Sequence, residues 1–106
     1  MHYVLVALTA AIQMTYEANV ASFGCNSIEE VAELQSIRAN DEAFQKVLVA
    51  KVVYGQCIVI DAGAVVHGVV EESDAKFIRI GRDLAPPGFM APLADFKTKP
   101  ATEKLD

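Results

Sequence analysis

The sequence predicts a single small domain of the α+β class, and three observations support this prediction. The chain has 106 residues, which is the size of one ordinary domain. A capped amphipathic helix is indicated at about residues 28–38. Residues 46–81 alternate β-branched runs with turn residues, which is typical of an antiparallel meander. We therefore expect an N-terminal β-hairpin, this helix, a meander that either stays open or closes partly into a barrel, and a proline-rich C-terminal arm.

The first 23 residues are the most ambiguous segment. An apolar stripe at helical spacing competes there with the β-branched and aromatic side chains that strands favour. We expect two strands, at about residues 2–9 and 15–23, because nothing before Tyr3 caps a helix. A helix is the alternative for residues 1–20.

The helix is the clearest element. Ser27 and Glu30 form the S-x-x-E capping box, in which each side chain serves the other residue's backbone N–H. Acidic side chains near its start favour the positive end of the helix dipole, which explains them better than metal binding does. One side is apolar and suited to pack on a sheet, through Ile28, Val31, Ala32 and Leu34. Asn40 can cap a further short turn through Phe44.

Turn residues divide the meander into four strands. The loop Asp61–Gly63 favours a three-residue connection with a left-handed glycine, because a two-residue loop would place Ala62 at positive φ. This loop would set Cys57 opposite His67 on the next strand.

The next hairpin should pair Glu71 with Lys76, an opposite-charge match, and this register places His67 opposite Ile80. Both faces of the meander are then apolar. The predicted faces are Cys57, Val59, Val65, His67, Val69, Ile78 and Ile80 on one side, and Ile58, Ile60, Ala64, Val66, Gly68, Val70, Phe77 and Arg79 on the other. Each face needs a cover. We expect the helix on one face and the arm, a barrel wall or a second copy on the other.

The C-terminal segment holds all four prolines of the chain, so it should not continue a central strand. We expect residues 82–96 to form an irregular arm packed on a domain of residues 1–96, and residues 97–106 to form a solvated tail. Aromatic and sulfur side chains in the arm can pack in the core or line a pocket; they are Phe89, Met90 and Phe96.

Charge and cysteine content narrow the partners and the compartment. The net charge of −5 repels phosphate backbones, so we expect no nucleic-acid partner. The apolar run within residues 1–16 is too short to cross a bilayer and lacks the basic start and small cleavage residues of a signal peptide. Cys25 and Cys57 suggest free thiols, with one disulfide as the alternative for an exported chain. We therefore expect a cytoplasmic protein with no membrane partner.

Reactive residue types occur, but without the context that chemistry requires. Cys57 and His67 are the types of a nucleophile and its base, yet their apolar neighbours favour burial in a core or interface. A zinc site from His2, Cys25, Cys57 and His67 lacks the close paired spacings of structural zinc sites. We expect no catalytic residue, metal or cofactor.

The run "GQCIVIDAGAVVHGV", residues 55–69, resembles the corresponding segment of small SH3-like barrels, some of which bind RNA. The resemblance covers only this run of the chain. The acidic balance of the chain disfavours the RNA role.

These observations predict a non-enzymatic binding or interaction module that works as a homo-oligomer, with a dimer as the first expectation, through an apolar sheet face. The alternative is a small-molecule-binding protein or small enzyme with an apolar pocket at the helix–sheet or subunit boundary, which would add a small apolar ligand as partner. The candidate ligand-binding or interface residues are Cys57, His67, Ile80, Phe89, Met90 and Phe96.

Overall fold

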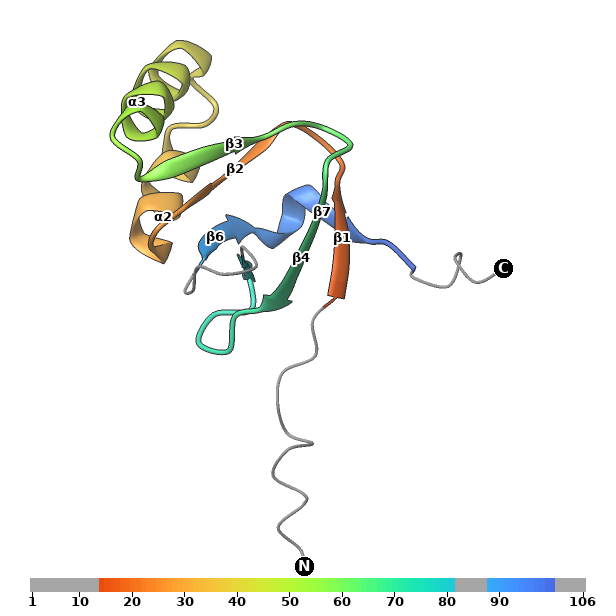
Figure 1. Ribbon diagram of the computed structural model, residues 1–106. Helices are drawn as coiled ribbons and strands as arrows, with labels where there is room; N and C mark the ends of the chain where they lie inside the picture. Colours follow the sequence, from red (N-terminus) through yellow and green to blue (C-terminus); the bar gives the residue numbers. More distant parts are fainter. Residues whose placement is uncertain (1–13, 82–87, 101–106) are drawn as a thin grey trace, which may run out of the picture.

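The computed structural model describes residues 14–81 and 88–100, and within these ranges it contains two α-helices and one antiparallel sheet of seven strands (Figure 1). The α+β prediction is confirmed. The strands are β1 (Met14–Ala18), β2 (Ser22–Cys25), β3 (Cys57–Ile60), β4 (Val65–Val70), β5 (Phe77–Ile80), β6 (Phe89–Pro92) and β7 (Phe96–Thr98). The helices are α2 (Ile28–Ser36), α3 (Asp41–Val53) and the short 3-10 helix η1 (Leu93–Asp95).

The strand order is β3-β2-β6-β5-β4-β1-β7. Figure 1 shows the β2–β3 pair and the β1–β4 pair meeting at a corner, where the chain bends twice side by side. Backbone bonds join the two bends: Gly63 N–H donates to Ala18 O at 2.8 Å, and Ala18 N–H donates to Ala64 O at 2.9 Å. Gly63 has the left-handed φ of 86° that its loop predicts.

The predicted pairing of β3 with β4 is wrong. β3 pairs with β2, β4 pairs with β1 and β5, and Cys57 consequently lies opposite Cys25 instead of His67. The Asp61–Gly63 loop forms as expected, but the chain turns a sheet corner there and does not fold back on itself. The one strand predicted at residues 15–23 is correspondingly split into β1 and β2.

The β4–β5 hairpin forms one residue out of the predicted register, with Val70 opposite Ile78. Glu71 binds Arg79 across the pair, so the expected match with Lys76 is not made. Asp74 instead holds the loop, because its carboxylate accepts from Lys76 N–H at 3.1 Å. This slip exchanges the faces on which the β5 side chains lie.

Helix α2 matches its predicted start, since Glu30 N–H donates to Ser27 Oγ at 3.2 Å. Residues 46–53, predicted as the first strand of the meander, belong to α3 instead. Asn40 caps α3, and Phe44 and Leu48, one turn apart, are its buried residues. That four-residue spacing buries one helix face, and this burial outweighs the strand preference of the valines.

The predicted irregular arm contains a central strand. β6 lies between β2 and β5, with Pro92 as its last residue, while residues 82–87 lie outside the described ranges. The predicted tail begins in β7, and Lys99 N–H donates to Thr15 O at 2.8 Å. Residues 101–106 and the strand predicted at residues 2–9 also lie outside the described ranges.

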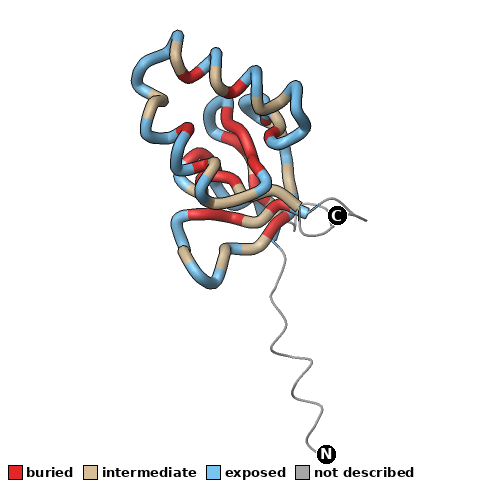
Figure 2. Tube along the Cα trace, turned by 90° about the vertical axis from the view of Figure 1, so that its left-hand side faces the viewer, coloured by how far each residue is buried: buried red, intermediate tan, exposed pale blue. Residues whose placement is uncertain are grey.

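Buried residues form two cores, and successive residues of β5 alternate between them, with Phe77 in one and Ile78 in the other. Figure 2 shows the buried positions along the strands and at intervals along the helices. The core beneath the helices contains Phe23, Cys25, Val31, Leu34, Phe44, Leu48, Cys57 and Phe77. The other contains Tyr16, Ala18, Ile60, Ile78, Ile80, Ala91 and Phe96. Both cores are formed within the chain, but neither covers Val65 and His67 of β4, which are exposed. The sheet is not closed, because β3 and β7 each have one paired side among the described strands.

Candidate binding surfaces

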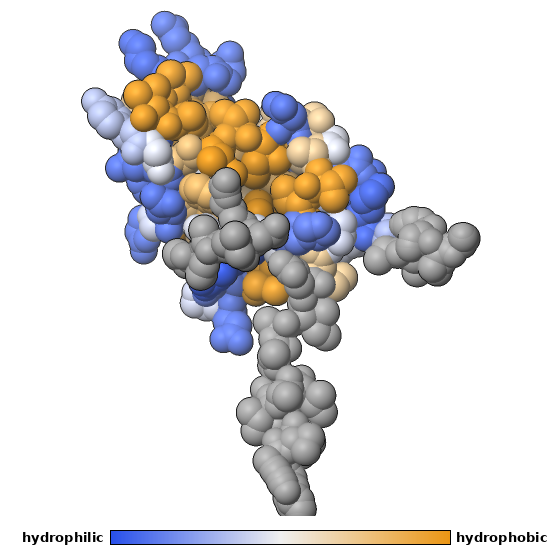
Figure 3. All heavy atoms as spheres, in the orientation of Figure 1, coloured by the Kyte–Doolittle hydropathy of each residue, from blue (hydrophilic) through white to orange (hydrophobic). Residues whose placement is uncertain are grey.

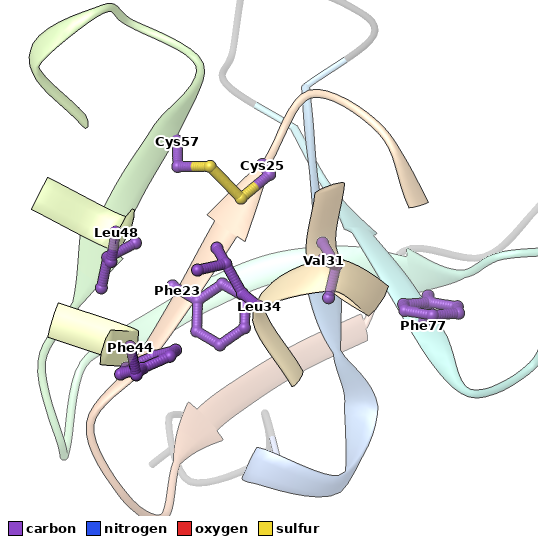
Figure 4. Packing of buried hydrophobic residues seen from close by; sticks show 8 residues of the cluster. All are labelled: Phe23, Cys25, Val31, Leu34, Phe44, Leu48, Cys57 and Phe77. Carbon is purple, nitrogen blue, oxygen red and sulfur yellow. A yellow bond between two sulfur atoms is a disulfide. The ribbon is translucent and has the colours of Figure 1, made fainter. Parts of the chain in front are cut away.

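The two cysteines form a disulfide between directly opposed residues of β2 and β3. Both are buried, and Figure 4 shows the bond beside Leu34 and Leu48 at one end of the helix-side core. The expectation of free thiols is therefore wrong. Cys57 is a covalent element of the core, and as half of a disulfide it supplies no thiolate nucleophile.

His67 lies on the exposed side of β4, away from both cores. Its Nδ1 atom is 3.2 Å from the hydroxyl of Thr15, its direct partner on β1. The predicted contact with Cys57 is not formed.

The other four predicted site residues divide between the two faces of the sheet. Ile80 and Phe96 are buried in the second core, and Phe89 is the cross-strand partner of Ile80. Met90 lies opposite Cys25 and packs against the helix-side core. The six predicted residues therefore do not form one site.

A pocket of about 690 Å³ lies at the boundary between α2 and the sheet. It is lined by Ala32, Gln35 and Ser36 of α2, by Ala75, Lys76 and Phe77, and by Pro92, Leu93 and Ala94. The alternative prediction from the sequence was a pocket at the helix–sheet boundary, and this pocket lies there. None of the six candidate residues named from the sequence lines it. Three segments far apart in the sequence build it, and no local motif marks them.

A polar cluster fixes the wall of this pocket. Arg38, just after α2, lies 2.9 Å from the carboxylate of Asp95 in η1 and donates to Gln35 Oε1 at 2.8 Å. Ser22 Oγ donates to the same carboxylate at 2.5 Å. These contacts tie the end of α2 to the segment that follows β6.

A second surface lies over α3 and β3. Four exposed apolar side chains mark it, with exposed fractions of 56% for Val49, 74% for Val53, 79% for Tyr54 and 56% for Val59. Figure 3 shows hydrophobic residues gathered over α3 and β3 on this side of the molecule. We call these four residues the α3–β3 band.

The backbone of Val59 faces the open edge of the sheet. The Cα atoms of Cys25 and Cys57 are 4.0 Å apart, which is the close spacing of a pair without mutual backbone hydrogen bonds. Val59 is two residues further along β3, opposite Phe23, and therefore has the same parity. Its N–H and C=O groups consequently point away from β2.

The two edges of the sheet differ in protection. At β7 the exposed residues Lys97, Lys99 and Pro100 hinder strand pairing. At β3 the sequence from Val52 to Ile60 contains no charged residue and no proline. Of the two edges formed by the described strands, the β3 edge therefore lacks the usual barriers to association.

The ion pair of Glu71 and Arg79 lies at the β4–β5 hairpin, where Glu71 directly follows β4 and Arg79 is in β5. The hydrogen bond from Arg79, supported by one from Ser73, holds the pKa of the Glu71 carboxyl below its ordinary value. Among the described residues, no group of three or more histidine, cysteine or acidic side chains is placed to hold a metal ion.

Comparison of the chain with protein-family models, curated proteins and solved structures gives no match. In the part of the chain that the structure describes, no helix has both the length and the apolar character needed to cross a membrane.

Proposed function

We propose that this domain is a non-enzymatic interaction module that pairs with a second copy of itself through the α3–β3 band. The observation that carries the proposal is the exposure of Val53, Tyr54 and Val59 beside an unprotected sheet edge. The sheet face expected to serve as the interface does not form one surface, because Cys57 lies in the helix-side core whereas Ile78 and Ile80 lie in the second core. The interface proposed here is therefore at the sheet edge.

Strand pairing supplies the specific contacts of this dimer. With β3 antiparallel to β3 of the second copy and Val59 facing its symmetry mate, the two outward N–H groups and two outward C=O groups of Val59 satisfy one another. Such an interface is self-complementary, as twofold symmetry requires. Burial of the valines adds the apolar contribution.

Charge also favours this surface over others. Copies that each carry a net charge of −5 repel one another. A contact across the uncharged stretch Val52–Ile60 keeps ionic groups out of the interface, where their desolvation would oppose association.

The compartment is part of the proposal. The cytoplasm was expected on the basis of free thiols, whereas the Cys25–Cys57 disulfide favours an oxidising compartment, where such bonds form and persist. Alkylation of the protein as isolated from its native host, followed by mass spectrometry, tests this point. Free, alkylated Cys25 and Cys57 would contradict it.

The dimer is tested by light scattering coupled to size-exclusion chromatography on the oxidised chain, at about 10 to 200 µM. Val59→Lys places a charge at the open edge and should weaken dimerisation at least tenfold. Val65→Lys is the matched control, because Val65 is also an exposed strand valine but lies on β4, between two neighbouring strands.

A wild-type dimer, a monomeric Val59→Lys and a dimeric Val65→Lys would support the proposal, provided that circular dichroism shows all three folded. A wild-type monomer at 200 µM would overturn it. A Val59→Lys variant that dimerises like the wild type would overturn the assignment to β3.

A further inference from the structure

We propose that the pocket between α2 and the sheet binds a small carboxylic acid with an apolar body, the carboxylate being held by Lys76. This inference is independent of the proposed dimer, since no residue of the α3–β3 band lines the pocket.

The size and the apolar lining fit the body of such a ligand. A volume of about 690 Å³ is within the range of small-molecule sites. Leu93 and three alanines are the apolar residues of the lining that are partly or fully exposed, while Phe77 and Pro92 in the same lining are buried. The helix side and the sheet side are fixed relative to each other by Arg38 and Asp95, so the pocket exists before a ligand arrives.

The charge of the lining selects an anion. Lys76 is the one charged residue of the lining, although the chain holds 14 acidic residues. Within the described ranges, the ion pairs formed by lysines involve Lys51 and Lys99, and Lys76 has none. The carboxylate of nearby Asp74 is engaged with the backbone N–H of Lys76. Among the described residues, the ammonium group of Lys76 thus has no ion-pair partner that an incoming carboxylate would have to displace.

The remaining polar groups of the lining point to the same ligand. Gln35 uses its carbonyl oxygen to accept from Arg38, which leaves its NH₂ group as a donor. The hydroxyl of Ser36 already donates to Glu33 O at 2.6 Å. An ammonium and an amide NH₂ are both donors, and a carboxylate accepts from both.

A titration with octanoate tests the inference. The oxidised full chain, labelled with ¹⁵N, is titrated with octanoate, octan-1-ol and octylammonium, and amide shifts are followed by NMR. Octanoate should move the amides of Phe77 and Leu93 with a dissociation constant of about 1 mM or tighter. Octanol should bind at least threefold more weakly, and octylammonium at least tenfold more weakly.

Two variants with matched controls separate the charge from the cavity. Lys76→Glu should weaken octanoate binding about tenfold, while Lys97→Glu, on β7, should leave it unchanged. Ala32→Phe fills the pocket from an exposed helix position and should abolish binding, whereas Ala50→Phe makes the same change at an exposed position of α3.

The pattern of affinities decides the outcome. Octanoate binding that is lost in Ala32→Phe and weakened in Lys76→Glu supports the site. Absence of shifts at the lining residues, equal affinity for octylammonium, or an unaffected Lys76→Glu variant would each overturn it. The titration is repeated on Val59→Lys, in which the proposed dimer edge is blocked. Because no residue of the α3–β3 band lines the pocket, octanoate should bind this variant as it binds the wild type, whether or not the dimer forms.

Discussion

Arg38 and Asp95 form an ion pair of 2.9 Å that joins the end of α2 to η1. Arg38 also donates to Ala21 O at 3.0 Å, and its guanidinium lies 5.3 Å from the ring centre of Phe23. Asp95 is a buried residue and accepts from Ser22 as well. One pair therefore connects the corner between β1 and β2, the helix layer and the segment after β6.

Removing the Asp95 carboxylate should destabilise the fold. Asp95→Ala leaves the guanidinium of Arg38 and the hydroxyl of Ser22 without their acceptor, at a cost of about 2 kcal/mol in the free energy of unfolding. Glu17→Ala, which breaks the more exposed pair with Lys99, should cost about 0.5 kcal/mol. Urea unfolding measures both. Equal costs would show that the cluster adds no more than a surface pair does.

Loss of the disulfide should cost more. Cys25 and Cys57 are 32 residues apart in the sequence, and a closed loop of that length corresponds to about 3 to 4 kcal/mol of unfolded-state entropy. The double variant Cys25→Ala/Cys57→Ala should unfold at correspondingly lower urea concentration, and the wild type with reductant should shift in the same direction. A reduced protein with an unchanged midpoint would contradict this account.

Gly68 is required because β5 approaches β4 closely there. A Cβ atom at Gly68 would lie 2.5 Å from the carbonyl oxygen of Arg79, which is backbone and must move. We expect Gly68→Ala to cost about 1 to 3 kcal/mol. Gly81→Ala is the control, because a Cβ at Gly81 meets no heavy atom of the described residues within 4 Å. Thermal unfolding measures both variants. Equal decreases in the two unfolding midpoints would contradict the explanation by close approach of β5.

The Glu71–Arg79 pair makes stability depend on acid pH. The pKa of Glu71 is lowered in the folded state. As the pH falls below the ordinary value of 4.5, the unfolded chain therefore binds more protons at this residue than the folded chain does. The stabilisation is complete above that pH and is lost as the pH falls through the folded-state pKa. Glu71→Gln and Arg79→Met should each flatten this part of the curve of unfolding free energy against pH. An unchanged slope in both variants would rule out the pair as its source.

Local signals in the sequence predict local structure well. The Ser27 cap and the glycine at position 63 have the roles that their chemistry indicates. The pairing of strands was not predictable in the same way, because the Asp61–Gly63 turn fits both a hairpin and a sheet corner. In the structure the turn is bonded to Ala18, which is distant in the sequence, and local turn chemistry does not reveal this partner.

The candidate sites were predicted less well than the fold. The pairing of Cys25 with Cys57 depends on β2 and β3 being neighbours, and cysteine spacing alone does not reveal this. In α3, consecutive valines indicate a strand by composition, although the spacing of Phe44 and Leu48 already fits a helix. The position of Lys76 beside α2 arises only after the register of the β4–β5 hairpin is known.

The central place of β6 has a consequence for synthesis of the chain. β2 and β5 emerge from the ribosome first, and each keeps an open hydrogen-bonding edge until residues 89–92 arrive between them. A nascent chain that lacks β6 therefore exposes one open edge on β2 and one on β5 at once, which makes it prone to aggregation. The sheet cannot be completed in the order in which its strands are made, because β6, which closes its centre, is made after both of its neighbours.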